Sequence, residues 1–469
     1  MVGIKSFGIY IPIWRISREL MGSGIPGERS VAGKDEDSLT MAVAAAINCV
    51  RGVDRETIDG IFFASTTSPF REKSAAATIA SVLDLRREAF TADVSGSLRA
   101  GTTALKFALD MIKAGTVNEV LVTAADCRLG APGSYFEQTF GDGAAALLLS
   151  NKDTVADLEA QQSIYDEIYD VWRRDVDLYV NAWEERFIYT CGYARVMKES
   201  ITRLMNKSGV NAKDISKVAI SVPDTRRAID LAISLGFDPK TQLQDSFMDT
   251  VGNTGSAQPL MLFAAALEEA NLGDRLLLAS YGSGSDTFLF KINSDRRPES
   301  LKRGFKVQVA SKKMIREYAT YLKWRQLIKM PPPRIDMTVS YPSATAIWRE
   351  TNRIYPLHGV KCKTCGAVQY PPQRVCTKCQ TKDNFEQVRL CDKKGRLFSY
   401  SFDPHRENVP LGLVNLENGG RIFLELTDVD TNEIHIDMPL ELTFRRVDLR
   451  REDSMYVYFW KATPIRIQS

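Results

Sequence analysis

Apolar and polar residues follow one another along the first 292 residues in blocks that match buried strands and amphipathic helices. Three short apolar runs lack polar alternation, as strands buried on both faces do: Ile58–Thr66, Glu119–Asp126 and Ala144–Ser150. Between them, apolar residues recur at spacings of three and four over Ser38–Val53 and Gly101–Gly115, which predicts two helices that face a core.

The same pattern then starts again. Lys217–Pro223 predicts a strand, Arg226–Phe237 a helix and Ser256–Leu272 a longer helix. Asp274–Ile292 predicts two closing strands around a glycine-rich turn. Two successive rounds of strand and helix indicate an α/β layered domain built from two similar halves.

The pattern changes after residue 292. The charged stretch Asn293–Arg303 predicts a domain boundary, and Lys312–Ile328 predicts an amphipathic helix that ends before Pro331–Pro333. A second short helix is expected near Ala344–Arg353. From Arg389 onward the apolar runs are short and β-like, as in a small barrel.

The composition is that of a globular protein. The chain has 469 residues, of which 44% are hydrophobic and 25% charged, and two to four domains are expected at this length. The net charge of +3 favours neither a nucleic-acid nor a membrane partner. No uncharged apolar run approaches the roughly 18 residues that a membrane helix needs, and the first residues lack the apolar core of a signal peptide. We therefore expect a cytoplasmic protein with no membrane partner.

Four clustered cysteines predict a metal site. Cys362 and Cys365 form one Cys-x2-Cys pair, and Cys376 and Cys379 form a second pair ten residues later. This spacing is typical of a zinc ribbon in which four thiolates hold one Zn²⁺. Four ligands leave zinc no open position, so a structural role is expected.

Some alternatives remain around this cluster. His358 could replace one ligand, whereas Cys391 is expected to be packed in the interior. A ribbon followed by an OB-type barrel could bind nucleic acid, and the ribbon is locally basic. Because aromatic residues are sparse in the ribbon, solvated lysines are the simpler interpretation, and we expect no nucleic-acid partner.

Several motifs of the first domain resemble the thiolase superfamily, and within it the 3-hydroxy-3-methylglutaryl-CoA synthases and type III ketoacyl synthases. These are FGDGAAALLLS (Phe140–Ser150), GNTGSA (Gly252–Ala257) and GDRLLLASYGSGSDTFLF (Gly273–Phe290). YDVWRRDVDLYV (Tyr169–Val180) resembles the archaeal kind of that synthase. The resemblance implies a layered domain of two stacked βαβαβ halves.

Residues from about 310 resemble the acyl-CoA-associated zinc-ribbon/OB-fold proteins, which usually accompany thiolase-like enzymes as separate chains. The two resemblances together imply a thiolase-like domain over residues 1–292 and a linker with helices over 293–355. A zinc ribbon over 356–388 and an OB-fold barrel over 389–469 would follow.

The resemblance also identifies the positions of the family's catalytic groups. In the superfamily, a cysteine at a buried helix start attacks the thioester. It lies five residues after the aspartate that matches Asp93, which is Leu98 here. The family histidine matches Ser221, and the glutamate of the synthases matches Thr66. The asparagine matches Asn253, whose amide could bind an acyl carbonyl or only tie a loop together.

Another nucleophile is hard to find near Leu98. Ser95 and Ser97 are close in sequence, but a serine needs a base to take its proton, and the first 357 residues contain no histidine. Turn and capping roles are the alternative for both serines. The resemblance therefore implies that the covalent acyl-enzyme route is absent.

Two functions follow from the resemblance. In the first, the chain is an acyl-CoA-processing subunit whose degenerate site is completed by an intact thiolase-like partner or by a second copy. In the second, it acts alone and without acylation on a carbon–carbon bond of a CoA thioester. Proton carriers for the second function could be Tyr135, Tyr189, Tyr193 or Asp224. We favour the first slightly.

Coenzyme A would need basic residues near the mouth of the site to bind its phosphates. Arg99 lies beside Leu98, and Arg226 and Arg227 follow the strand that ends near Ser221. These three arginines are the predicted CoA-binding residues.

Overall fold

The structure is a computed structural model that describes the chain except residues 222, 296–297, 329–342, 407, 448–454 and 467–469. It divides into two compact units. The first comprises residues 1–80 and 85–330, and the second comprises residues 81–84 and 331–469. Each unit is described by itself below.

The first unit is built on one nine-stranded sheet with the order β11-β12-β13-β8-β1-β7-β6-β4-β5. Five strands come from the first half of the unit: β1 (Gly3–Tyr10), β4 (Gly60–Ala64), β5 (Phe90–Val94), β6 (Glu119–Asp126) and β7 (Gly143–Ser150). Four come from the second half: β8 (Ala156–Tyr165), β11 (Lys217–Ile220), β12 (Arg275–Tyr281) and β13 (Gly284–Ile292).

The pairing of these strands demonstrates the predicted duplication. In the first half, β1 pairs antiparallel with β7, β7 antiparallel with β6, and β6 parallel with β4. In the second half, β8, β13, β12 and β11 repeat the same sequence of relations. A short antiparallel contact between β1 and β8 joins the halves.

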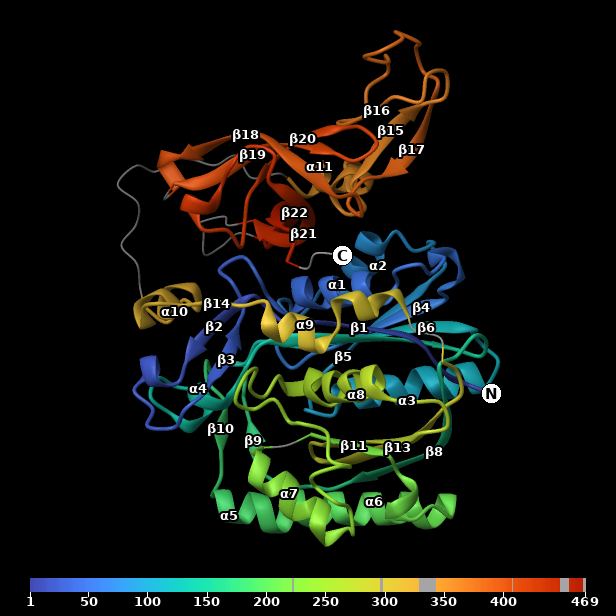
Figure 1. Cartoon of the computed structure of the whole chain (residues 1–469), viewed down its shortest axis with the longest axis vertical. Helices are drawn as coiled ribbons and strands as arrows, with labels where there is room; N and C mark the ends of the chain where they lie inside the picture. The colour runs from blue at the N-terminus through green and yellow to red at the C-terminus, as the bar shows by residue number, and fades with distance from the viewer. Residues whose placement is uncertain (222, 296–297, 329–342, 407, 448–454, 467–469) are drawn as a thin grey trace. The chain divides into compact units, whose positions relative to one another are not determined.

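The strands of the first half and those of the second half form two half-sheets of the nine-stranded sheet. Helices form layers on both sides of each half-sheet (Figure 1). Two of them, α3 (Ala100–Lys113) and α8 (Gln258–Glu269), lie between the half-sheets, with α1 (Ser38–Cys49) on one outer side and α6 (Arg195–Ser208) and α7 (Thr225–Ser234) on the other. Residues 258–267 of α8 are all buried, as expected for a helix that is apolar around its whole circumference. The thiolase-like α/β prediction is confirmed.

Shorter elements complete this unit. They are β2 (Trp14–Ser17), β3 (Glu28–Val31), α2 (Ala75–Leu83), α4 (Tyr135–Thr139), β9 (Val171–Trp172), β10 (Asn181–Ala182), α5 (Glu185–Phe187), a π-helix (Ile188–Ala194), α9 (Phe305–Ala310), β14 (Lys313–Met314) and α10 (Tyr318–Trp324). The single helix predicted over Lys312–Ile328 is wrong in part, because β14 pairs with β2 and only α10 is helical. This pairing holds the chain to the first unit beyond the boundary expected at Asn293–Arg303. The Pro331–Pro333 stretch lies outside the described residues.

The second unit contains a ribbon and a five-stranded sheet. The ribbon consists of β15 (His358–Cys362), β16 (Val368–Gln369) and β17 (Phe385–Arg389). The sheet has the order β20-β19-β18-β21-β22 and comprises β18 (Gly395–Asp403), β19 (Val409–Leu416), β20 (Arg421–Glu425), β21 (Pro439–Val447) and β22 (Val457–Pro464). Two short helices, α11 (Ala344–Arg349) and α12 (Thr351–Ile354), precede the ribbon. The predicted zinc ribbon and small OB domain are confirmed.

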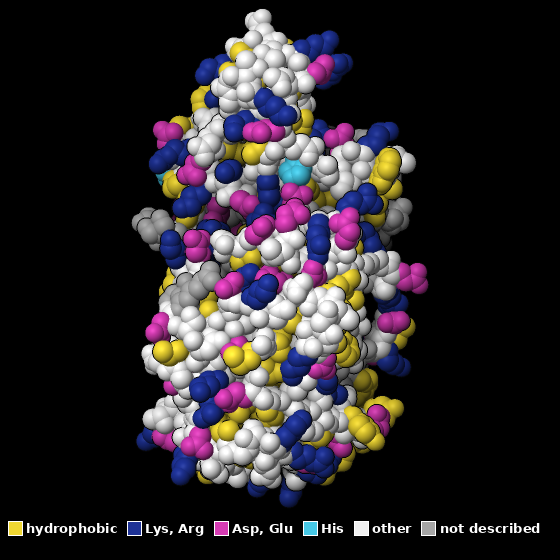
Figure 2. Space-filling view, turned by 90° about the vertical axis from the view of Figure 1, so that its right-hand side faces the viewer, with side chains coloured by type: hydrophobic (Ala, Val, Ile, Leu, Met, Phe, Trp, Pro, Cys, Tyr) yellow, Lys and Arg dark blue, Asp and Glu magenta, His cyan; other side chains and the backbone are white. Residues whose placement is uncertain are grey.

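Charged side chains of both signs lie close together on the surface of the molecule (Figure 2). Figure 2 shows one face of each unit, on which Lys and Arg side chains lie among Asp and Glu side chains. Among the described residues, no helix is both long and apolar enough to span a bilayer.

Candidate functional site

The first unit contains a pocket into which both halves project side chains. It encloses about 770 Å³ including its open mouth. Its walls are mostly aromatic and aliphatic, with a few polar groups. The lining residues that matter for the chemistry are Leu98, Arg128, Tyr135, Asp170, Tyr189, Tyr193, Ser221, Arg227, Asn253 and Tyr281. Three of the four positions matched to the family's catalytic groups thus meet in one cavity.

Leu98 lies at the start of α3, where the family has its nucleophile. The turn from Ser97 to Arg99 packs tightly against Gly282, because a Cβ atom there would lie 3.0 Å from the Arg99 nitrogen and 3.1 Å from the Leu98 Cβ. The Ser97 hydroxyl donates to the Gly282 carbonyl at 2.9 Å and accepts from the Arg99 N–H at 3.2 Å. Ser97 therefore has the turn-forming role that the sequence left open for it.

Ser221 and Asn253 make structural hydrogen bonds inside the pocket. The Ser221 hydroxyl accepts from the Tyr281 N–H at 2.9 Å, and its carbonyl accepts from the Tyr193 hydroxyl at 3.0 Å. The Asn253 Oδ1 accepts from Arg128 Nη2 at 2.6 Å and from the Gly255 N–H at 2.9 Å. Neither contact supplies the base that the family histidine provides.

Thr66 does not line the pocket, unlike the other three matched positions. Its N–H donates to Asp126 Oδ1 at 2.7 Å, and its carbonyl accepts from Arg173 at 2.6 Å. Asp126 is fully buried at the end of β6 and also accepts from Ser65, Thr67 and the Ser256 N–H. The carboxylate of Asp126 thereby ties the end of β4 to the loop before α8.

Two of the three predicted CoA-binding arginines are held by other groups. The Arg99 guanidinium donates to the carbonyls of Gly282 and Ser283 and forms an ion pair with Asp286 at 3.0 Å. Arg227 lines the pocket but pairs with two carboxylates and lies over the Tyr189 ring at 4.6 Å. Arg226 is exposed outside the pocket lining. CoA binding by these arginines stays a prediction.

The candidate proton carriers differ in what their side chains already bind. Burial raises the pKa of Tyr193, whose hydroxyl donates to the Ser221 carbonyl. Asp224 caps α7 by accepting from the Arg227 N–H at 2.9 Å. Tyr189 lies in the π-helix, and burial raises the pKa of its hydroxyl as well. Tyr135 is half exposed at the edge of the pocket, and burial raises its pKa too.

Sequence reasoning missed three polar residues of the pocket, namely Arg128, Asp170 and Tyr281. The Tyr281 hydroxyl is buried and lies beside Asp170. Burial, and then the charge of Asp170 and a hydrogen bond to its carboxylate, raise the pKa of Tyr281. Tyr281 is the last residue of β12 and lies in the glycine-rich motif Gly273–Phe290. Its place in that motif is the sequence signal from which it could have been found.

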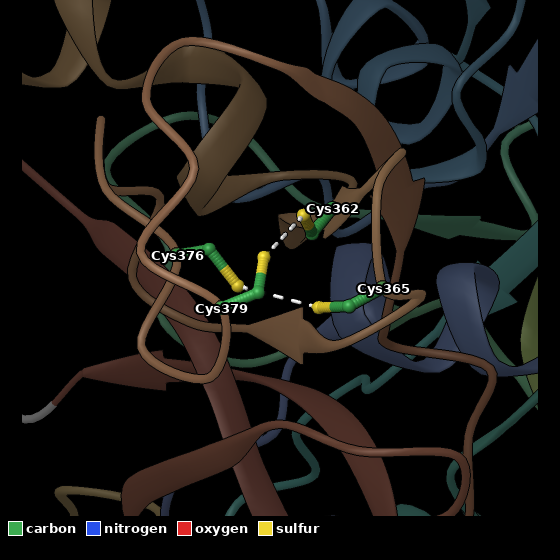
Figure 3. A group of neighbouring side chains, drawn as sticks. All are labelled: Cys362, Cys365, Cys376 and Cys379. Carbon is green, nitrogen blue, oxygen red and sulfur yellow. Dashed lines mark hydrogen bonds between the residues drawn. The ribbon is translucent and has the colours of Figure 1, made fainter.

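The four ribbon cysteines converge on one point (Figure 3). Their sulfur atoms all lie within 4.8 Å of one another, with the Cys362–Cys379 pair at 3.6 Å and the Cys365–Cys376 pair at 3.5 Å. A tetrahedron with Zn–S bonds of about 2.3 Å has edges of about 3.8 Å, so the group fits zinc. His358 is not part of this group. The Cys391 thiol is buried and donates to the Pro356 carbonyl.

Similar turns produce this convergence. In each Cys-x2-Cys pair the residue after the second cysteine has a positive φ, 74° at Gly366 and 60° at Gln380. The N–H of each donates back to the carbonyl of the pair's first cysteine, at 2.9 and 3.0 Å. Hydrogen bonds from Thr381 lower the pKa of Cys379, whereas hydrogen bonds with the neighbouring thiols raise the pKa of Cys365. The four thiols therefore share protons when no metal is bound, and metal binding releases these protons.

Comparison with known proteins assigns the family. The hydroxymethylglutaryl-CoA synthase of Archaeoglobus fulgidus is 32% identical over 345 residues, which cover 70% of this chain and all of the relative. The corresponding protein of Methanosphaera stadtmanae is 29% identical over the same shares. The chain belongs to the hydroxymethylglutaryl-CoA synthase family.

Matches to protein families divide this member of the synthase family into parts. Residues 92–163 match 3-oxoacyl-[acyl-carrier-protein (ACP)] synthase III, and residues 205–288 match its C-terminal part. Residues 357–386 match the rubredoxin-like zinc ribbon domain of ChsH2, and residues 387–445 match the C-terminal OB-fold domain of ChsH2. The chain therefore joins a thiolase-like synthase domain to ChsH2-type domains.

Solved structures show the same fold. A 3-oxoacyl-[acyl-carrier-protein] synthase III from Aquifex aeolicus superposes with a TM-score of 0.57 at 23% identity, covering 62% of this chain and all of that one. An HMG-CoA synthase complexed with CoA superposes with a TM-score of 0.61 at 18% identity, covering 72% and 92%. These superpositions show the fold of the first unit, which is that of the synthases.

Proposed function

We propose that the first unit binds a CoA thioester in this pocket and acts on the carbon beside the thioester carbonyl without becoming acylated. The observation that supports the proposal is that Leu98, Ser221 and Asn253 line one pocket. An aliphatic side chain cannot accept an acyl group, and a positioned acid–base group contributes roughly 10²–10⁴-fold when present. The proposal takes the pocket as the family's site with its covalent groups replaced.

The remaining polar groups suit a non-covalent reaction. Removing a proton beside a thioester produces an enolate, which hydrogen-bond donors in a dry pocket stabilise. Because the pKa values of Tyr189 and Tyr281 are raised, both hydroxyls stay protonated at neutral pH. They are therefore suited to donate to an enolate oxygen, and Asp170 on the same wall is the nearby carboxylate that could accept a proton.

A second candidate, a subunit completed by a partner chain, is favoured by a different observation. The excursion between β8 and the π-helix exposes large apolar side chains at Tyr165, Tyr169, Val176, Leu178, Trp183 and Phe187. Exposed apolar residues in such number are typical of a protein–protein contact surface. The excursion leads directly to Ile188 and Tyr189 of the pocket wall, so a partner bound there would adjoin the pocket.

Exchange of the α-protons of acetyl-CoA in deuterated water tests the proposal without knowledge of the second substrate. The chain alone, with Cys49, Cys127 and Cys191 replaced by serine, should bind acetyl-CoA and exchange its methyl protons. Exchange that appears only after addition of a catalytically intact thiolase-like chain would favour the subunit. Absence of binding at millimolar acetyl-CoA would refute both.

A further inference from the structure

Arg128 is a buried cation in the wall of the pocket. It lies two residues after β6, and only 7% of its surface is exposed. Its guanidinium carbon lies 3.9 Å from the centroid of the Phe140 ring, a cation–π contact that holds the planar group in one orientation. Burial lowers the pKa of Arg128 to about 10, so the group still carries its charge at neutral pH.

Few hydrogen-bond acceptors of the described residues lie within reach of the Arg128 guanidinium. Its Nη2 donates to Asn253 Oδ1 at 2.6 Å, whereas the buried Nε has no partner among the described residues. No hydrogen bond joins Nη1 to a described residue, and the Arg128 side chain lines the pocket. A guanidinium placed in this way can still donate to an incoming group.

No described carboxylate pairs directly with Arg128. The charge of Asp126 favours the protonated, charged form of Arg128. Both oxygens of Asp126 already accept hydrogen bonds, however, Oδ1 from the end of β4 and Oδ2 from the Ser256 N–H. Both groups lie against Gly255, because a Cβ there would be 2.3 Å from Asp126 Oδ2 and 2.9 Å from Arg128 Nε. The other pocket carboxylate, Asp170, accepts from the Val171 N–H at 2.6 Å. A buried cation without a direct counter-ion is costly to the free protein.

We propose that Arg128 binds a carboxylate of the substrate, so that the pocket selects CoA thioesters whose acyl chain ends in a carboxylate. This inference rests on the proposed function, because it names the substrate class of the same pocket. A carboxylate supplies the missing acceptors and a full negative charge, and guanidinium–carboxylate pairs are among the strongest hydrogen-bonded pairs in proteins. A neutral acyl chain would exclude water from Arg128 and would offer its N–H groups no hydrogen-bond acceptor in place of that water.

Calorimetric titration of the full chain with two thioesters of equal chain length tests this directly. Glutaryl-CoA carries the terminal carboxylate, and pentanoyl-CoA lacks it. The wild type should bind glutaryl-CoA at least tenfold more tightly, and Arg128→Gln should remove that preference by weakening glutaryl-CoA alone. Arg128→Lys, which keeps the charge but not the planar fork, should give an intermediate preference. Coenzyme A without an acyl group shows whether Arg128 acts on the phosphates instead.

Each outcome separates the inference from the proposed function. Equal affinity of the wild type for both thioesters, or equal weakening of all three ligands by Arg128→Gln, overturns the carboxylate assignment and leaves the proposed function standing. Failure of the wild type to bind any thioester refutes the proposed function itself. Arg203→Gln removes an exposed arginine of α6 that pairs with Glu199 and should leave all three affinities unchanged. The wild-type comparison decides the matter even if Arg128→Gln does not fold.

Discussion

Leu98 occupies the position that the resemblance matches to the nucleophile of the family, in a turn that neighbouring residues hold in place. It lies at the start of α3, where a helix N-terminus would favour a thiolate, and its turn is fixed by contacts of Ser97, Arg99 and Gly282. These contacts do not depend on the side chain at position 98. A thiol introduced there should therefore meet a bound thioester in nearly the geometry of the family.

The variant Leu98→Cys should consequently become acylated by acetyl-CoA at pH 8, at least tenfold faster than Leu272→Cys. Leu272 is an exposed leucine in the loop after α8 and provides a surface thiol for comparison. Peptide mass mapping locates the acetyl group. Equal rates at the two positions would mean that the thioester does not lie against Leu98.

At this scale the sequence pointed to some residues of the pocket and not to others. Leu98, Ser221 and Asn253 were chosen by counting within motifs, and all three line the pocket, while their roles stay predictions. Arg128 and Tyr281 carry no motif of their own. Their importance depends on the burial of their polar atoms and on the groups around them, which only the packed structure determines. The role of Arg99 in holding Gly282 likewise required the tertiary contact.

Among the elements, the π-helix Ile188–Ala194 has the most direct bearing on the pocket. It contributes Ile188, Tyr189 and Tyr193 to the wall, and Gly192 allows the Tyr281 hydroxyl to approach, since a Cβ there would lie 2.4 Å from it. Insertions of this kind are frequent at functional sites. The apolar spacing that predicts α-helices does not reveal a π-turn, so the sequence did not predict it.

The end of α8 carries a titratable group that links two elements. Glu268 accepts from the Phe305 N–H at 2.6 Å, at the start of α9. Burial, together with repulsion from Glu269, raises the pKa of Glu268 to about 7, from an ordinary value of 4.5. The folded chain therefore binds more protons than the unfolded chain between these two values, and the stabilising contribution of protonated Glu268 is lost as pH rises through 7.

Replacing this group should accordingly show a pH-dependent effect. Glu268→Gln should raise the free energy of unfolding by about 1–2 kcal/mol at pH 8 and by little or nothing at pH 5, because glutamine mimics the protonated acid. Urea denaturation at the two pH values measures the difference. Glu199→Gln, in a surface pair with Arg203, should change stability by less than about 0.5 kcal/mol at both values. The same increment for Glu268→Gln at pH 5 and pH 8 would contradict the account.

For the whole molecule, the sequence predicted the architecture more reliably than the boundary between its parts. The repeat of strand and helix signals yielded the duplicated sheet, and the cysteine spacing yielded the ribbon. The extension of the first unit to residue 330 was missed, because the two-residue pairing of β14 with β2 joins segments some 300 residues apart. Such a long-range contact leaves no periodic signal in a single stretch of sequence.

The metal site makes a prediction for the second unit. The purified chain should contain one zinc ion, and Cys376→Ser should lower the zinc content to well under half and remove hydrogen-exchange protection from β15 and β17, because ribbons of this kind depend on their metal to fold. Cys391→Ser, which changes a buried thiol outside the group, should keep the zinc. Retention of full zinc content by Cys376→Ser would show that these thiols do not hold the metal.

The claim on which the functional account depends is that the pocket handles a thioester without forming an acyl-enzyme. The most direct measurement is the intact mass of the wild-type chain after incubation with acetyl-CoA at a concentration that saturates binding, followed by peptide mapping. The account predicts bound acetyl-CoA and no covalent acetyl group on any peptide from residues 1–292. A stoichiometric acetyl group on a residue of the pocket would contradict it.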